Sequence, residues 1–209
     1  MNLITLSDPL SAQAEAYRTL RTNLHFASLE APLKTIVVTS PGPAEDKGIV
    51  LANLAVVMSQ AEKNVIAVDV CLRHPSLHDR FSLSNERGLS DLLRSPAADV
   101  ALPLHQTNVP HLRLLPGGSV VPNPLDLLVS HRMSDIISNL IGMADIVLFE
   151  APPMLVSSDT AILASQTDGV LLVVELGKTR REQVQQSKDL LNRAHARLLG
   201  AVMANAPHE

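Results

Sequence analysis

The sequence predicts one α/β domain over residues 1–209, a three-layer sandwich with a mostly parallel central sheet and helices on both faces. Short apolar runs rich in β-branched residues alternate with segments of helical length, the pattern of parallel strands that are buried on both faces. Apolar residues make up 46% of the chain and aromatic residues only 2%, so aliphatic side chains must fill the core. The length suits a single substantial core rather than two domains.

The elements follow in chain order from their hydrophobic patterns. An amphipathic N-terminal helix is predicted at about 10–29, because apolar positions that include Leu20, Leu24 and Phe26 recur at helical spacing and Pro32 ends the segment. Buried strands are predicted at Thr35 to Thr39, Val65 to Val70, Leu112 to Leu115, Ile146 to Phe149, Val170 to Val174 and Leu198 to Met203.

Charge and composition exclude several classes of protein. The net charge is −4 and no block of Lys or Arg occurs, so the chain lacks the basic surface that holds a nucleic-acid backbone. No apolar run approaches the roughly 18 residues of a membrane span, and neither a leader pattern nor a cysteine pair is present. We therefore expect a cytoplasmic protein that is recruited to the inner face of the membrane only by a partner.

A lysine-ending loop stands between the first predicted strand and the helix pattern that follows it. A strand, such a loop and a helix are the context of a P-loop, whose backbone N–H groups and lysine hold phosphates while a following Ser or Thr binds magnesium. The candidate phosphate-binding residues are Gly42, Pro43, Ala44, Glu45, Asp46, Lys47, Gly48 and Ile49.

Eight stretches, in order along nearly the whole chain, resemble the bacterial tyrosine kinases (BY-kinases) of capsule and exopolysaccharide export, relatives of the MinD and ParA ATPases. They are Glu15 to Arg21, the loop above, Ala52 to Ala55, Val68 to His78, Gly88 to Leu93, Pro122 to Pro124, Ala151 to Pro153 and Asp168 to Val174. The resemblance implies a P-loop NTPase-like fold, ATP or ADP with magnesium as cofactors, and protein-tyrosine kinase activity. It also implies a C-terminal tyrosine cluster, whereas the only tyrosine here is Tyr17.

The loop departs from the family pattern, which ends in Gly-Glu-Gly-Lys followed by Ser or Thr. This sequence reads Ala44-Glu45-Asp46-Lys47-Gly48. Asp46 places negative charge where phosphate should dock, and two unit charges about 4 Å apart repel by roughly 4 kcal/mol at an effective dielectric near 20, or about three decades of affinity. We expect Lys47 to pair with Asp46, and we expect Gly48 to weaken both magnesium binding and the helix start.

The two remaining metal elements of the family are also altered. Its Asp-x-Asp-x-Arg reads Asp69-Val70-Cys71-Leu72-Arg73 here, and its aspartate before Pro-Pro is Glu150. The resemblance makes Lys47, Asp69 and Glu150 the vestigial catalytic residues and Asp69 the candidate metal ligand. Asp69 alternatively caps a turn. Cys71 is interpreted as a small buried hydrophobic residue, with a reactive or soft-metal role left open.

Ala204 takes the place of the base-recognising Asn that the family carries after its last strand, with Asn205 one position later. This substitution is a further departure in the nucleotide site.

Glu15, Arg18 and Arg21 lie three residues apart on one side of the predicted N-terminal helix. The simplest interpretation is a surface ion-pair ladder. In the family the same spacing makes contacts between subunits of a ring, so the resemblance implies an oligomer interface.

The sequence therefore predicts a catalytically impaired, kinase-like regulator or scaffold of polysaccharide export. Its expected partner is a membrane polysaccharide co-polymerase or adaptor, or a related kinase, in a homo- or hetero-oligomer. The alternatives are an active ATP-dependent tyrosine kinase or ATPase of the same system, and a MinD-like positioning protein.

Overall fold

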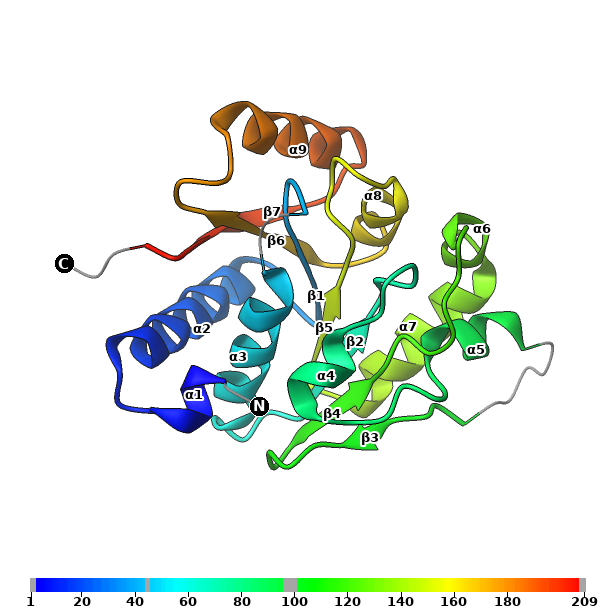
Figure 1. Cartoon of the computed structure of the whole chain (residues 1–209), viewed down its shortest axis with the longest axis horizontal. Helices are drawn as coiled ribbons and strands as arrows, with labels where there is room; N and C mark the ends of the chain where they lie inside the picture. The colour runs from blue at the N-terminus through cyan, green and yellow to red at the C-terminus, as the bar shows by residue number, and fades with distance from the viewer. Residues whose placement is uncertain (1–2, 44–45, 96–100, 207–209) are drawn as a thin grey trace.

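The computed structural model describes residues 3–43, 46–95 and 101–206. Within these ranges one seven-stranded sheet has the order β3-β4-β2-β5-β1-β6-β7 (Figure 1). All neighbouring strands are parallel except β3 and β4. The strands are β1 (Thr35–Thr39), β2 (Val65–Asp69), β3 (His105–Gln106), β4 (Leu112–Leu115), β5 (Ile146–Glu150), β6 (Gly169–Glu175) and β7 (Leu198–Ala204).

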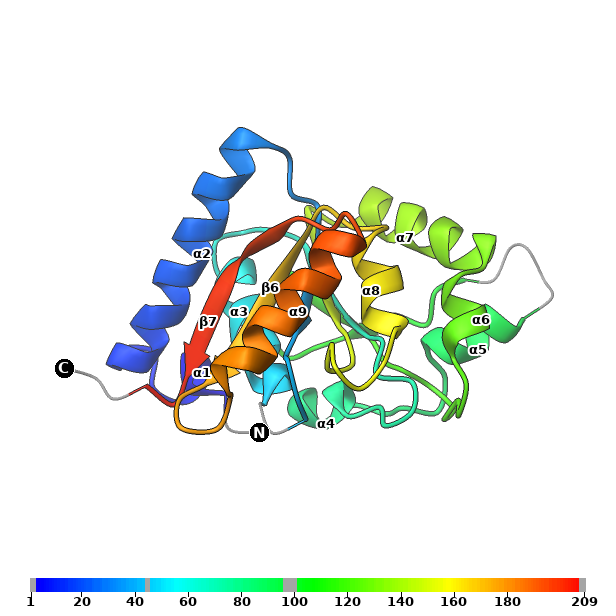
Figure 2. The same cartoon turned by 90° about the horizontal axis from the view of Figure 1, so that it is seen from above.

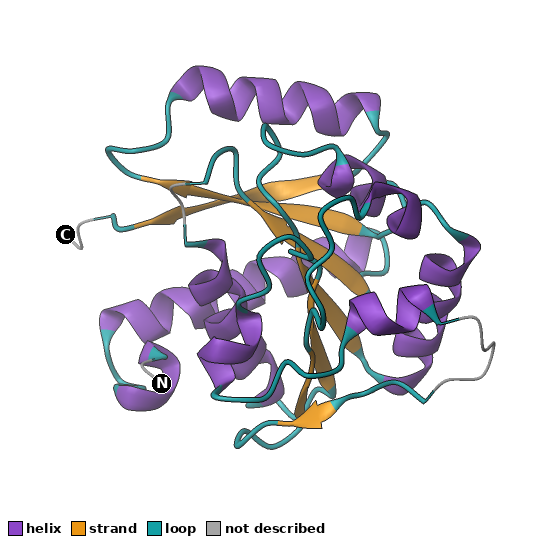
Figure 3. Ribbon diagram, turned by 45° about the vertical axis from the view of Figure 1, so that its right-hand side comes forward, coloured by secondary structure: helices purple, strands orange, loops and turns teal. Residues whose placement is uncertain are grey.

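Helices cover both faces of the sheet, as Figure 3 shows with helices in purple on either side of the orange strands. The described helices are α1 (Ile4–Ser7), α2 (Ala12–Glu30), α3 (Lys47–Ser59), α4 (Leu77–Phe81), α5 (Leu89–Arg94), α6 (Leu125–Leu128), α7 (His131–Met143), α8 (Asp159–Ala164) and α9 (Arg181–Arg193). Helices α1 to α4 pack over one face and α5 to α9 over the other. The predicted fold class, a P-loop NTPase-like three-layer sandwich, is confirmed.

Alternate residues of each central strand supply two separate cores. In β1, Val37 packs into the core under α7 and α8, while Ile36 and Val38 pack under α2 and α3. Because successive side chains of a strand point to opposite faces, both sets must be apolar. This explains why the sequence shows continuous apolar runs instead of a polar and apolar alternation.

Helix α2 lies beside β7 at one side of the sheet (Figure 2), in the part of the chain where the sequence predicted an N-terminal helix at about 10–29. Ser11 caps it by accepting a hydrogen bond from Ala14 N (3.2 Å). Phe26 was expected on the apolar face but is 59% exposed, because the inward positions are taken by residues such as Ala14 and Leu24. None of the described helices is both long and apolar enough to cross a membrane.

Strands β2, β5 and β1 are neighbours, so their carboxyl ends meet at one edge of the sheet. Asp69 ends β2 and Glu150 ends β5, and the two residues are register partners across that pair of strands. Helix α3 begins at the same edge, after the loop that follows β1. Crevices at the carboxyl ends of parallel strands are where ligands bind in open α/β sheets.

Candidate functional site

Lys47 and Glu150 form a buried ion pair at this edge of the sheet. Lys47 Nζ lies 3.3 Å from Glu150 Oε1, and both side chains are largely inaccessible to solvent. The expectation that Lys47 pairs with Asp46 is therefore wrong. Lys47 is the first residue of α3 and its side chain reaches the sheet, whereas Asp46 precedes the helix and is half exposed.

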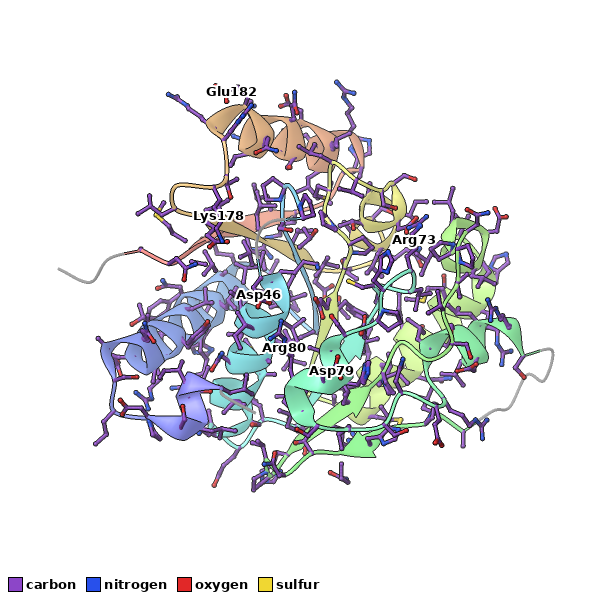
Figure 4. The ribbon with its side chains drawn as sticks, viewed as in Figure 1. Asp46, Arg73, Asp79, Arg80, Lys178 and Glu182 are labelled. Carbon is purple, nitrogen blue, oxygen red and sulfur yellow. The ribbon has the colours of Figure 1, made fainter. Side chains whose placement is uncertain are left out.

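Asp46 is the N-cap of α3. Its Oδ1 accepts a hydrogen bond from Ile49 N (3.1 Å), and Arg80 of α4 donates to Oδ1 (3.0 Å) and Oδ2 (2.9 Å). Figure 4 shows Asp46 and Arg80 where α3 and α4 approach each other. Aspartate is a favoured N-cap and its charge complements the positive helix end, so the residue that opposes phosphate also stabilises the start of α3. This cap offsets the weakening that was expected from Gly48.

Asp69 is fully buried and holds the turn that follows β2. Its Oδ1 accepts from Cys71 N (2.9 Å), and its Oδ2 accepts from Ser76 N (2.8 Å) and Leu77 N (2.9 Å). These three bonds match the turn-capping interpretation of Asp69. They also fix the carboxylate at the edge of the sheet, where the metal interpretation placed it.

Cys71 is buried beside both carboxylates, and its thiol donates to the Glu150 carbonyl oxygen (Sγ to O, 3.8 Å). Asp69, Cys71 and Glu150 each offer one possible metal-ligand atom, and these atoms lie within 4.8 Å of one another. Glu150 Oε2 is buried and has no hydrogen-bond partner among the residues that the structure describes. A buried acceptor of this kind is uncommon in folded proteins.

Burial shifts the pKa values of the ionisable groups in this cluster. It raises the pKa of Glu150 to about 7 although Lys47 opposes the shift, and it raises the pKa of Cys71 well above its usual value. Burial alone would lower the pKa of Lys47, but the neighbouring Cys71, Glu150 and Asp69 outweigh it and raise that pKa. The ammonium group of Lys47 is thus the cation that this acidic cluster holds.

Gly48 and Glu150 are complementary in shape. A Cβ atom added at Gly48 would lie 3.0 Å from Glu150 Oε1, a tighter contact than real Cβ atoms usually make. A Ser or Thr at position 48 would therefore require the Glu150 carboxylate to shift by a few tenths of an ångström. The two departures from the family pattern fit each other.

At two positions the described residues differ from the donors that a magnesium–phosphate site uses. Magnesium requires hard oxygen ligands in near-octahedral geometry, whereas position 48 has no hydroxyl and position 71 carries a thiol. The Ile49 N–H, which would face a phosphate at the start of α3, already donates to Asp46. Gly42 and Pro43 precede this region, and the predicted loop residues Ala44 and Glu45 lie outside the described residues.

Ala204 is the last residue of β7, one position beyond the predicted end of the strand at Met203, and Asn205 follows with a positive φ of 53°. The Asn205 side-chain amide donates to Glu175, so it is engaged with the neighbouring strand.

Sequence reasoning missed the role of two arginines. Arg80 lies 34 positions from Asp46, and no local pattern links the two residues. Arg73 connects its own turn after β2 to two other segments. Its Nε donates to Pro122 O (3.0 Å). Its Nη1 donates to Ser157 Oγ (3.1 Å) and pairs with the buried Asp159 at the start of α8. The sequence signal for Arg73 was its place in Val68 to His78, one of the eight stretches that resemble the family.

The three predicted interface residues of α2 do not share one role within the chain. Glu15 and Arg18 pair on the helix surface (2.8 Å), and Arg18 also donates to Pro9 O. Arg21 Nη1 instead donates to Val57 O (2.8 Å) near the end of α3. Arg21 therefore braces α2 against α3, while Glu15 and Arg18 remain on the outer surface.

Comparison with known proteins places this geometry in a family. No protein-family model matches the chain. The chain is 39% identical over 203 residues to the tyrosine-protein kinase YwqD of Bacillus subtilis, covering 97% of this chain and 85% of YwqD. It is 31% identical over 199 residues to the putative tyrosine-protein kinase CapB of Staphylococcus aureus, covering 95% of this chain and 87% of CapB.

Solved structures agree. The kinase domain of the Escherichia coli tyrosine kinase ETK superposes with a TM-score of 0.91 at 30% identity, covering 100% of this chain and 83% of that one. The chimerical protein CapA2B2 also gives 0.91, at 31% identity, covering 99% and 90% of the two chains. MinD of Pyrococcus horikoshii, at 21% identity and a TM-score of 0.67 over 82% of this chain and 70% of MinD, shares the fold alone. The chain belongs to the bacterial tyrosine-kinase family.

Proposed function

We propose that this protein is a kinase-like regulator or scaffold of capsular or exopolysaccharide biosynthesis and export whose phosphoryl transfer is impaired. One observation carries the proposal: the groups at the start of α3 that would meet a nucleotide are engaged with one another. Asp46 accepts a hydrogen bond from the Ile49 N–H and forms an ion pair with Arg80, while Glu150 forms an ion pair with Lys47.

Phosphoryl transfer depends almost entirely on positioning and on neutralising phosphate charge. An incoming phosphate would have to displace the Asp46 carboxylate or bear its repulsion. That repulsion is roughly 4 kcal/mol for bare charges about 4 Å apart at a dielectric near 20. Arg80 and solvent screen part of it, because Asp46 is half exposed. The loss of the hydroxyl at position 48 and of a carboxylate at position 71 adds to the defect.

The proposed partner is a membrane polysaccharide co-polymerase or adaptor, or a related kinase. The outward-facing Glu15 and Arg18 of α2 are available for a contact between subunits, and Arg21 would hold α2 in place for it. In this proposal the protein works in the cytoplasm and reaches the membrane through that partner.

The second candidate is an active ATP-dependent tyrosine kinase or ATPase of the same system. It is favoured by the convergence of Lys47, Asp69 and Glu150 at the carboxyl edge of the sheet, and by the names of the relatives. In that case Asp46 would have to leave the start of α3 when nucleotide binds. The likeness to MinD extends to the fold only and does not favour a positioning role.

Turnover assays separate the two candidates. We expect ATP hydrolysis and tyrosine phosphorylation at background level, with and without a candidate partner, and no change in Lys47→Ala. Magnesium-dependent turnover that Lys47→Ala abolishes would instead establish the active kinase.

A further inference from the structure

The cluster of Asp69, Cys71 and Glu150 has a donor set of its own, which differs from a magnesium site. We propose that these three residues bind a thiophilic divalent cation of the zinc class. The residues come from the carboxyl ends of β2 and β5 and from the turn after β2, and their possible ligand atoms lie within 4.8 Å of one another. All three are buried.

The choice of cation follows from the ligand chemistry. A thiolate is a poor ligand for magnesium or calcium, whereas zinc accepts mixed sulfur and carboxylate ligands. Two carboxylates and one thiolate give three protein ligands, the number that zinc sites with an open fourth position use. The thiol proton of Cys71 passes to solvent when the metal–sulfur bond forms.

Glu150 supplies an independent observation that points to a ligand. Its side chain is almost completely buried and Oε2 has no hydrogen-bond partner among the described residues, while Oε1 faces Lys47. Such an acceptor loses its hydration on burial and gains nothing in return. A cation that contacts Oε2 would satisfy it.

The surroundings of Asp69 resemble the outer shell of a metal site. Backbone N–H groups of Cys71, Ser76 and Leu77 donate to its two oxygens and fix the orientation of the carboxylate. Oδ1 accepts only one of these bonds and keeps a further lone pair for a metal. Hydrogen bonds of this kind orient metal ligands in many proteins.

Lys47 is the competitor of the metal, because its ammonium group already occupies Glu150 Oε1. A divalent cation must displace it or bind beside it against charge repulsion. Removing this charge in Lys47→Met should therefore tighten metal binding. This expectation is opposite to that for a working P-loop, whose lysine serves the ligand, and it does not depend on whether the protein binds nucleotide.

The test is a titration of the untagged chain with Co²⁺ and Cd²⁺, followed by near-ultraviolet absorption. Cys71 is the only cysteine, so a thiolate-to-metal charge-transfer band reports this residue alone. We expect the band to saturate at one equivalent and to vanish in Cys71→Ser. The apparent affinity should fall at least tenfold in Asp69→Asn and in Glu150→Gln, and rise in Lys47→Met.

Thermal unfolding with Zn²⁺ gives a second measurement that does not depend on the carboxylate variants. We expect Zn²⁺ to raise the Tm of the parent chain and to raise the Tm of Cys71→Ser by much less. Equal rises would show binding elsewhere, for example on surface histidines, and would overturn it. The absence of a charge-transfer band in the parent would overturn it as well, as would a band of unchanged affinity in Asp69→Asn and Glu150→Gln.

Discussion

The two halves of the candidate site differ in how their carboxylates are paired. In the phosphate half, at the start of α3, the half-exposed Asp46 carboxylate has found both a backbone donor and an arginine. In the metal half, formed by Asp69, Cys71 and Glu150, one oxygen of the buried Glu150 is paired with Lys47, and the other has no partner within the described part of the chain. The comparison teaches that the Asp46 carboxylate is paired within the chain, whereas Glu150 keeps one acceptor oxygen free of described partners, and that oxygen is where the proposed cation would bind.

The largest expected effect on stability is that of Asp69, which holds the turn after β2. Asp69→Ala removes the acceptor of three backbone N–H groups, and leaving buried donors unpaired costs about 1–3 kcal/mol each, so we expect at least about 3 kcal/mol of lost stability. Urea unfolding measures this loss. Asp69→Asn keeps a carbonyl oxygen and should lose less; equal losses would contradict the turn-holding role.

Glu150 should make stability depend on pH. Its pKa is about 7 in the folded chain against an ordinary 4.5, so between these values the folded state binds more protons than the unfolded state. The free energy of unfolding should therefore fall as pH rises from about 4.5 to about 7. Urea unfolding at pH 5 and pH 7 checks this expectation.

Glu150→Gln is the matched control for that pH dependence, because it keeps the shape of the side chain and removes its titration. The decrease in stability between pH 5 and pH 7 should be smaller in this variant. An identical decrease in both proteins would show that other groups cause it.

In the phosphate half, the cap should matter more than the ion pair. Asp46→Ala removes the N-cap of α3 and should cost about 1 kcal/mol, whereas Arg80→Ala removes only a solvent-exposed pair and should cost a few tenths. Both values follow from urea unfolding. A greater loss of stability in Arg80→Ala than in Asp46→Ala would contradict this interpretation of the phosphate half.

The smallest stability effect is expected on α2, where assembly is the more informative measurement. If the protein self-associates, Glu15→Ala/Arg18→Ala should give a smaller particle in light scattering with little change in stability, because the pair is exposed. Arg21→Ala is the comparison variant, since it removes the bond to Val57 O and should also lower stability. An unchanged particle in both variants would contradict the interface.

The sequence predicted the central strands well because β1, β2, β5 and β6 are local apolar runs with β-branched residues and are buried at nearly every position. Strand β7 was also predicted, but its residues are only partly buried or exposed, because it lies at the edge of the sheet. Sequence reasoning missed β3, whose two residues His105 and Gln106 are polar and pair only at the edge of the sheet. It also gave Lys47 the wrong partner, because adjacency along the chain suggested Asp46. The N-cap geometry turns Asp46 back over the helix start instead, and Arg80 arrives there from α4.

Glu150 shows a second limit of sequence reasoning. Its extra methylene group was recognised, but the consequence depends on Gly48, more than a hundred positions earlier. Restoring a hydroxyl at position 48 would crowd Glu150 Oε1, at 3.0 Å from the new Cβ. To remove this close contact, the design of a repaired site combines Glu150→Asp with Asp46→Gly, Gly48→Ser and Cys71→Asp.

Calorimetric titration with ADP in the presence of magnesium tests the central claim most directly. The parent chain should show little or no binding, with or without magnesium. The variant that carries all four substitutions, once circular dichroism shows that it is folded, should bind ADP in a magnesium-dependent manner, with a gain of up to about three decades from the loss of the Asp46 charge. Tight magnesium-dependent binding by the parent chain, with no gain in the variant, would contradict the account.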